Sequence, residues 1–442
     1  MERNNRMMQN KTDSGWLGVL ALIAGVSVVG PILPASAAEI KLADGQRLAA
    51  LIEAYDGKGD VGVYLTSGDK KNVALRDVAS IFFSGREARF IRTGDQKFLL
   101  AAGGQICGAV EELKNGNVLE VNSQSLGRHV VPVRYFHGMA ALAVEGRPAR
   151  LAEDLMRDDG IAPTVENAYL DFVLDRRGVP YAGVVENFSP LRIEFEHDEQ
   201  LQPVRIDTYK LAGVRLAEAT KDRSGAIDPV DVIHVAVECR DMSFIVGHIV
   251  GIDPFTWKLR PNFDVKRVID IPTSEISRVY VLGGRTVFLT DLKPTKVVEQ
   301  TTLAPPQPYQ KNSNSQGESM DIGGFIYRAG VGVHANSKLT YEIGGKFQTF
   351  FADVGIDGRL EKEGSVVFVV YGDNNKELYR SPVVRGKSAG GGLPIQVSVD
   401  GVKELTLSVE STDDLDQADL ANWGAARVSR QAGAQAPKQE NM

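Results

Sequence analysis

The chain has 442 residues and a formal net charge of −7, with 43% apolar and 24% charged residues. This length allows two to four domains, and this apolar content is typical of chains with packed cores, which excludes a globally disordered protein. The acidic balance argues against the basic patch of a nucleic-acid-binding protein, so we expect no nucleic-acid partner.

The first 37 residues are predicted to be a secretory signal peptide. Arg3, Arg6 and Lys11 form a basic start, an uncharged run extends from Trp16 to Leu33, and the stretch 35–37 (Ala-Ser-Ala) has the pattern of a cleavage site. The alternative is an uncleaved membrane anchor, because the apolar run is about as long as the shortest spans. Cleavage would give a secreted, periplasmic or cell-envelope protein with no membrane span.

A fourfold repeat is predicted between residues 38 and 285. Four segments end in an apolar triplet spaced i, i+5, i+8, and a small residue stands 28 or 29 positions before the middle member of each triplet. The triplets are Val73/Val78/Ile81, Val131/Phe136/Met139, Ile206/Leu211/Val214 and Ile271/Ile276/Val279, and the small residues are Ala50, Gly108, Gly183 and Gly247. A small residue fits a point where a strand bends and a neighbouring backbone comes close.

Each copy is expected to form a small β-barrel, since short strands alternate with turns along it. Leu191 to Phe195, for example, alternates apolar and polar residues as a half-buried strand does. The pattern resembles Sm-like and SH3-like barrels, although an acidic, exported set does not suit RNA binding. The repeats are therefore interpreted as spacers or protein-contact modules. Their expected bounds are 38–92, 93–145, 166–220 and 221–285.

A short helix from Arg147 to Asp158 is expected within a spacer at 146–165, because Leu151 and Leu155 lie one turn apart. The two cysteines, Cys107 and Cys239, fall in different repeats and have neither metal-site nor CxxC spacing. A disulfide would require an oxidising compartment, and two buried free thiols are the alternative.

A β-sandwich is expected at residues 286–430, followed by a disordered tail at 431–442. The stretch from Thr286 to Pro294 is interpreted as the end of the repeats, and the polar segment after it, through Ser315, as a loop or linker. Farther on, residues 395–399 and 405–409 alternate apolar and polar residues, as strands do. The residues 373–375 (Asp-Asn-Asn) predict a hairpin turn with positive φ.

Several motifs in this part occur in a fixed order. They are Gly330 to Ser337, Tyr341, Phe350 to Asp357, Gly364 to Val369, Gly401 to Leu407 and Trp423 to Ala426. This order resembles the NPCBM family, a carbohydrate-binding module that accompanies family-98 glycoside hydrolases and many exported bacterial proteins. The resemblance covers a third of the chain and implies a galactose-binding-like β-sandwich that binds a glycan or polysaccharide.

Four residues of the sandwich are candidate sugar contacts: Trp423, Asn422, His334 and Asn336. Sugars stack their C–H faces on aromatic rings and hydrogen-bond to polar groups. An indole, two amides and an imidazole could supply both kinds of contact. Taken singly, Trp423 and His334 are more readily explained as core or structural residues. Calcium is the one cofactor that the sequence suggests, with oxygen ligands from Asp357, Asp416 and Asp419. The simpler alternative is an acidic loop exposed to solvent.

No catalytic site is expected. The stretch 386–390 (Gly-Lys-Ser-Ala-Gly) matches G-x-S-x-G, but the Gly-Gly-Leu-Pro that follows cannot begin the helix of a nucleophile elbow or a phosphate loop. The six histidines lack metal-ligand spacing. We therefore expect an exported, non-catalytic, glycan-binding protein, with other envelope proteins as further partners. The alternative is a structural or protein-interaction envelope protein that binds no sugar.

Overall fold

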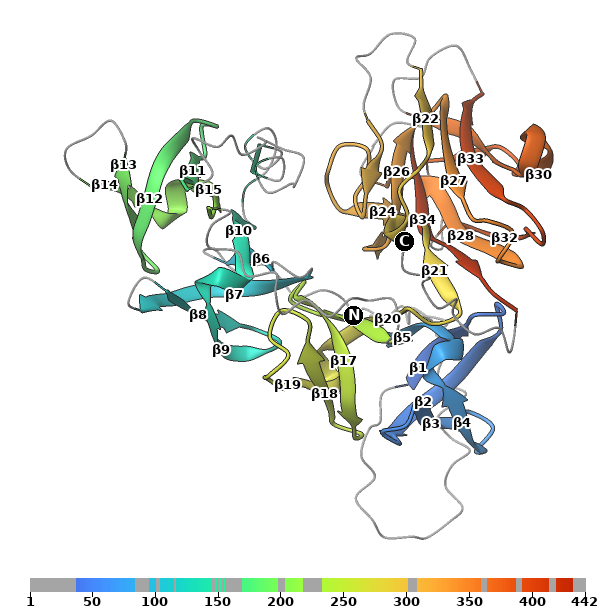
Figure 1. Ribbon diagram of the computed structural model, residues 1–442, viewed down its shortest axis with the longest axis horizontal. Helices are drawn as coiled ribbons and strands as arrows, with labels where there is room; N and C mark the ends of the chain where they lie inside the picture. Colours follow the sequence, from blue (N-terminus) through green and yellow to red (C-terminus); the bar gives the residue numbers. More distant parts are fainter. Residues whose placement is uncertain are drawn as a thin grey trace, which may run out of the picture. The chain divides into compact units, whose positions relative to one another are not determined.

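The computed structural model describes residues 37–431 except for 84–94, 101–103, 115–116, most of 143–168, 198–202, 218–232, 301–307, 359–363, 387–391 and 413–418. The expected leader, apart from Ala37, and nearly all of the expected tail lie outside this range, as does most of the G-x-S-x-G stretch. The first strand begins at Ala37, at the expected end of the leader. The described part is mainly β, as predicted (Figure 1).

Four copies of a five-stranded motif, here called repeats one to four, make up the first two-thirds of the chain. Repeat one has β1 (Ala37–Leu42), β2 (Arg47–Tyr55), β3 (Asp60–Leu65), β4 (Lys70–Ala74) and β5 (Val78–Phe83). Repeat two has β6 (Gln96–Leu100), β7 (Gly104–Lys114), β8 (Val118–Ser123), β9 (Gly127–Pro132) and β10 (Phe136–Ala141). Repeat three has β11 (Asp171–Asp175), β12 (Pro180–Phe188), β13 (Arg192–His197), β14 (Val204–Asp207) and β15 (Leu211–Arg215). Repeat four has β16 (His234–Cys239), β17 (Phe244–Ile252), β18 (Thr256–Pro261), β19 (Ile269–Pro272) and β20 (Ile276–Leu282).

The strand order is the same in every repeat. The first strand pairs with the second and the fifth, the second with the third, and the third with the fourth. Among the described residues, the fourth strand of a repeat does not pair with its own fifth strand. Each repeat is therefore a five-stranded sheet that does not close into a barrel, whereas the sequence predicted a barrel-like fold without specifying its closure.

The apolar triplets mark the passage from the fourth to the fifth strand. A one-turn 3₁₀ helix separates these strands in all four copies: η1 (Leu75–Asp77), η2 (Val133–Tyr135), η3 (Thr208–Lys210) and η5 (Thr273–Glu275). The first triplet member lies before this turn and the other two lie on the fifth strand, so the constant length of the turn fixes the spacing.

The small residues occupy the point where the second strand leaves the first strand and joins the third. Gly183 pairs with Asp171 on one side and with His197 on the other. A Cβ atom there would lie 2.0 Å from the carbonyl oxygen of Glu196, and one at Gly247 would lie 2.3 Å from that of Arg260. The backbone of the third strand therefore comes close to the small residue, as predicted, and the space left at Gly183 and Gly247 admits only glycine.

The repeats associate in two equivalent pairs through their fifth strands. Repeats one and four join through β5 and β20, with Ile81 opposite Val279. Repeats two and three join through β10 and β15, with Met139 opposite Val214. The pairings are antiparallel and have the same register relative to the triplets. Strands β7 and β17 then join the two pairs into one twenty-stranded sheet.

The described positions of the expected spacer helix, namely Pro148, Leu151, Ala152 and Leu155, have helical backbone. Ala152 and Leu155 are buried in a small apolar cluster with Ala140, Leu174 and Ala212. Because this cluster joins residues of repeats two and three, the helical segment packs on the repeats that it connects.

Two six-stranded sheets form the C-terminal sandwich. One contains β21 (Thr286–Phe288), β23 (Gln310–Lys311), β26 (Gly330–His334), β28 (Thr349–Ile356), β32 (Leu393–Ser398) and β34 (Leu420–Ser429). The other contains β22 (Lys296–Glu299), β27 (Ser337–Glu342), β29 (Ser365–Tyr371), β30 (Glu377–Arg380), β31 (Val384–Arg385) and β33 (Glu404–Ser411). A separate hairpin contains β24 (Met320–Ile322) and β25 (Phe325–Tyr327). The core between the two sheets consists of aliphatic and aromatic residues such as Val354 and Phe368.

Two sequence interpretations of this region need correction and one is confirmed. The stretch from Thr286 to Pro294 does not end the repeats, because β21 pairs with β34 of the sandwich. The segment interpreted as a linker contributes β22 and β23, which pair with β27 and β26. The turn at 373–375 connects β29 to β30 with positive φ at Asn374 and Asn375, as predicted.

Candidate functional site

The candidate residues gather at one end of the sandwich, here called the loop end. There β26 ends at His334, β28 ends at Ile356 and β34 begins at Leu420. His334 is paired with Leu420, and Ile356 with Ala421. In the second sheet β29 begins and β33 ends nearby, since Val366 is paired with Ser411. Antiparallel pairing thus brings together residues that are widely separated in the sequence.

Trp423 lies in the core rather than on the surface. Its side chain is 1% exposed. The ring stands edge-on to Phe368 with centroids 5.0 Å apart, and it also contacts Phe350. Stacking of a sugar needs an exposed ring face, so the burial of Trp423 speaks against that role and assigns the indole to packing between the sheets.

Asn422 is also fully buried and acts together with Asp357. Its Nδ2 donates to Oδ2 of Asp357 at 2.8 Å, and the same oxygen accepts the backbone N–H of Asp321. Oδ1 of Asn422 has no hydrogen-bond donor among the described residues. These bonds fasten the β24–β25 hairpin to the loop end. Asp321 was not singled out from the sequence, because it lies in a polar stretch without a motif.

His334 and Asn336 belong to the turn between β26 and β27. His334 is 4% exposed, and its Nδ1 lies 3.2 Å from the carbonyl oxygen of Ala335. Asn336 has a φ of +61°, and its Oδ1 accepts the backbone N–H of Ser411 at 3.3 Å. Of the four candidate sugar contacts, Asn336 is partly exposed and the other three are buried.

Asp419 is held inside the loop end by two serines that the sequence did not indicate. Its Oδ1 accepts the backbone N–H of Ser365 and its Oδ2 accepts the hydroxyl of Ser411, each at 2.9 Å. Asp357 and Asp419 thus accept hydrogen bonds from different side chains, Asn422 and Ser411 respectively, and Asp416 lies outside the described residues. Within the described ranges, no group of three or more His, Cys, Asp or Glu residues is placed to hold a metal ion.

Both cysteines are buried free thiols in the repeats. Burial raises the pKa of Cys107 to about 12 and that of Cys239 well above its ordinary value. Thiols with such pKa values carry almost no thiolate at neutral pH and are poor nucleophiles.

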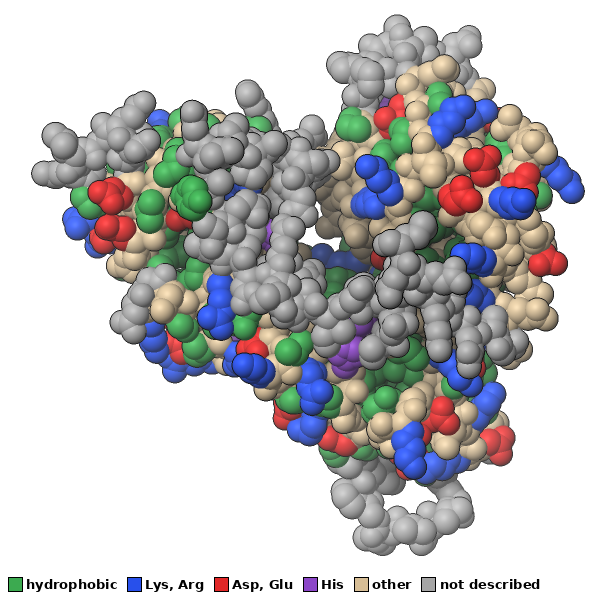
Figure 2. All heavy atoms as spheres, viewed as in Figure 1, with side chains coloured by type: hydrophobic (Ala, Val, Ile, Leu, Met, Phe, Trp, Pro, Cys, Tyr) green, Lys and Arg blue, Asp and Glu red, His purple; other side chains and the backbone are tan. Residues whose placement is uncertain are grey.

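Basic and acidic side chains are interspersed over the described surface in the view of Figure 2. In the part of the chain that the structure describes, no helix has the length and apolar character needed to cross a membrane.

Residues 285–429 match the family model of the NPCBM/NEW2 domain. This part of the chain is therefore an NPCBM/NEW2 domain, and the family predicted from the motif order is confirmed. A protein of Renibacterium salmoninarum named "Putative endo-alpha-N-acetylgalactosaminidase" is 32% identical over 117 residues, which are 26% of this chain and 8% of that relative. The chain thus spans less than a tenth of that relative.

Two solved structures from Clostridium perfringens are similar to parts of this chain. CBM51 from GH95, in complex with methyl-galactose, is 24% identical and has a TM-score of 0.30; the match covers 33% of this chain and 99% of that one. The CBM51-2 and INT domains of ZmpB are 19% identical, with a TM-score of 0.31 and coverage of 47% of this chain and 39% of that one.

Proposed function

We propose that the protein is exported and binds carbohydrate, without catalysing its cleavage, through its NPCBM/NEW2 sandwich. The family match over residues 285–429 carries this proposal. In the proposed organisation, a leader at 1–37 is removed, the four Sm-like repeats occupy 38–145 and 166–285 around the helical spacer, and the binding module occupies 286–430. The repeats display the module at the cell envelope or outside it.

The loop end is the proposed sugar-binding surface. Asn336 offers an amide at this surface, and two hydrogen bonds hold it to β33: its backbone N–H donates to the carbonyl of Val409, and its side-chain Oδ1 accepts from the backbone N–H of Ser411. Trp423 and Asn422 support this surface from below, since both are buried. A rigid amide can hydrogen-bond to a sugar hydroxyl without a large loss of side-chain entropy.

The proposal is tested with the full chain on a glycan array, followed by calorimetric titration of any sugar that binds. Asn336→Gly removes the amide while tolerating the positive φ of +61°. Asn374→Gly is the matched control, because Asn374 has a φ of +56° in the β29–β30 turn, away from the loop end. We expect binding by the wild-type chain and the control, with at least tenfold weaker binding by Asn336→Gly. Equal binding by the two variants would remove Asn336 from the site and leave carbohydrate binding in place.

A structural or protein-interaction role without sugar binding is the second candidate. The observation that favours it is the burial of Trp423, which leaves the most obvious stacking residue inaccessible. A folded full chain that binds no glycan on the array would establish this alternative. Release of reducing ends from a glycan by the purified chain would instead contradict the non-catalytic part of the proposal.

A further inference from the structure

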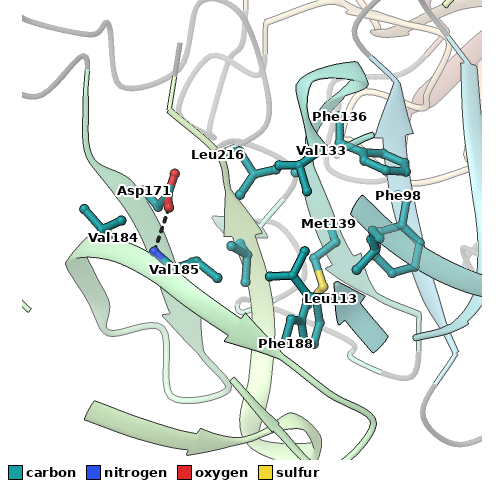
Figure 3. Close-up of a pocket in the computed structure, with 13 residues that line it drawn as sticks. Phe98, Leu113, Val133, Phe136, Met139, Asp171, Val184, Val185, Phe188 and Leu216 are labelled. Carbon is teal, nitrogen blue, oxygen red and sulfur yellow. Dashed lines mark hydrogen bonds between the residues drawn. The ribbon is translucent and has the colours of Figure 1, made fainter. Parts of the chain in front are cut away.

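An apolar cavity of about 210 Å³ lies between repeats two and three. Repeat two lines it with Phe98, Leu119 and Met139, and repeat three with Val185, Phe188 and Leu216. Figure 3 shows side chains of both repeats around the cavity, among them Phe98 and Met139 of repeat two and Val185 and Phe188 of repeat three. The cavity is thus built at the junction that β10 and β15 form.

The corresponding place between repeats one and four is filled by aromatic rings. Trp257 is fully buried there, with its ring edge-on to Phe83 at 6.2 Å. Trp257 is paired with Ile252 at the end of β17, just as Leu119 is paired with Leu113 at the end of β7. Phe83 follows Ile81 by two residues, just as Leu216 follows Val214. Leucines therefore replace both aromatic residues where the cavity occurs.

The lining of the cavity is apolar apart from one carboxyl group. Its one ionisable lining residue is Asp171, whose carboxylate accepts the backbone N–H groups of Val185 at 2.8 Å and Ala217 at 2.7 Å. The remaining lining residues are aliphatic, aromatic, methionine or glycine. A charged or strongly polar ligand would lose its hydration without compensation, whereas a neutral apolar one gains from leaving water.

We propose that this cavity binds a neutral apolar molecule with one or two aromatic rings. Apolar cavities of about 150 Å³ already bind benzene. The volume here is larger, and an indole and a phenyl ring fill the equivalent junction between repeats one and four. We therefore expect a ligand of about the size of one or two aromatic rings. The site lies in the repeats and does not depend on carbohydrate binding by the sandwich.

The test uses the full chain and 5-fluoroindole, with binding followed by ¹⁹F NMR. We expect saturable binding to the wild-type chain, at least tenfold weaker binding to Leu119→Trp, and unchanged binding to Val130→Trp. The control places the same indole on the neighbouring strand β9, at a position that is 40% exposed. Absence of saturable binding, or equal binding by Leu119→Trp, overturns the proposal. If circular dichroism shows that Leu119→Trp is unfolded, Leu216→Phe is tested in its place. Weaker binding by this variant supports the proposal, and equal binding overturns it.

A reciprocal variant checks the equivalence of the two pairs. Trp257→Leu is expected to open a second cavity between repeats one and four, so a folded variant should bind two equivalents of 5-fluoroindole instead of one. Binding of a single equivalent by the folded variant would contradict the assignment of Leu119 as the counterpart of Trp257. The result for Leu119→Trp decides the proposal whether or not this variant folds.

Discussion

Arg328 in the sandwich donates a hydrogen bond from Nε to Oε1 of Glu238 in repeat four, at 2.9 Å. The two side chains are 18% and 11% exposed. Beside them, Nη1 of Arg278 in repeat four donates to the carbonyl oxygen of Ile326 in the sandwich at 2.6 Å. These contacts mean that the sandwich and the fourth repeat share a largely dehydrated ionic contact.

Loss of this contact should destabilise the protein. In Glu238→Gln, Arg328 keeps a buried charge without its carboxylate partner, which costs about 3–5 kcal/mol of unfolding free energy. The measurement is urea unfolding of the full chain. Glu377→Gln is the control, because Glu377 bonds Arg380 at an exposed position, where such a pair contributes less than about 1 kcal/mol. Equal, small effects of both substitutions would show that the buried contact does not form in solution.

Trp423 should matter for stability rather than for direct sugar contact. Trp423→Ala removes a buried indole from between Phe350 and Phe368, and we expect a loss of about 3–5 kcal/mol. Phe325→Ala, at a position 49% exposed on the β24–β25 hairpin, should change the unfolding free energy by about 0.5 kcal/mol or less. A Trp423→Ala variant with wild-type stability and no glycan binding would place the indole at the surface instead.

Gly183 should not tolerate a side chain. Gly183→Ala places a Cβ atom 2.0 Å from the carbonyl oxygen of Glu196, so the paired strands must separate, at a cost of about 2–3 kcal/mol. Gly62→Ala is the matched control within a strand of repeat one, because its nearest neighbouring atom lies 3.5 Å away. Thermal unfolding of the two variants should therefore differ clearly. A similar Tm for both would contradict the close approach of strands β12 and β13.

His129 should make the protein less stable in mild acid. Burial, together with the nearby charge of Arg267, lowers the pKa of His129 below its ordinary value. The folded state therefore resists protonation that the unfolded state accepts near pH 6.5. The stability contribution is complete above that pH and is lost as the pH falls below it. Urea titrations at pH 7.5 and 5.5 should show a smaller loss of stability for His129→Gln than for the wild-type chain, and an identical loss would exclude His129 as a contributor.

The fourfold repeat could be predicted because it depends on local geometry. A three-residue 3₁₀ turn sets the distance from Val73 to Val78, and a close backbone contact demands glycine at Gly183 and Gly247. Both leave a constant spacing in the sequence. The open form of each repeat was not predictable in the same way, because the spacing does not reveal whether the fourth strand pairs with the fifth.

The strands β22 and β23 and the position of Trp423 were harder to predict. Both strands are short and lie at sheet edges, where polar side chains face water and the apolar alternation disappears. For Trp423, the family motif fixes its place along β34 but not which face of the sheet it occupies. The opposing ring of Phe368, which belongs to the second sheet, decides its burial.

The pairing of β5 with β20 joins residues almost 200 positions apart in the sequence. A ribosome needs roughly 10–40 s to add that many residues. During this interval the hydrogen-bonding edge of the nascent first repeat has no partner within its own chain, and such an edge readily captures strands of other molecules. Pairing between residues so far apart in the sequence also favours slow folding. Productive folding of this chain therefore depends on keeping its first repeat soluble, by a chaperone or by delayed folding, until its last repeat has been synthesised.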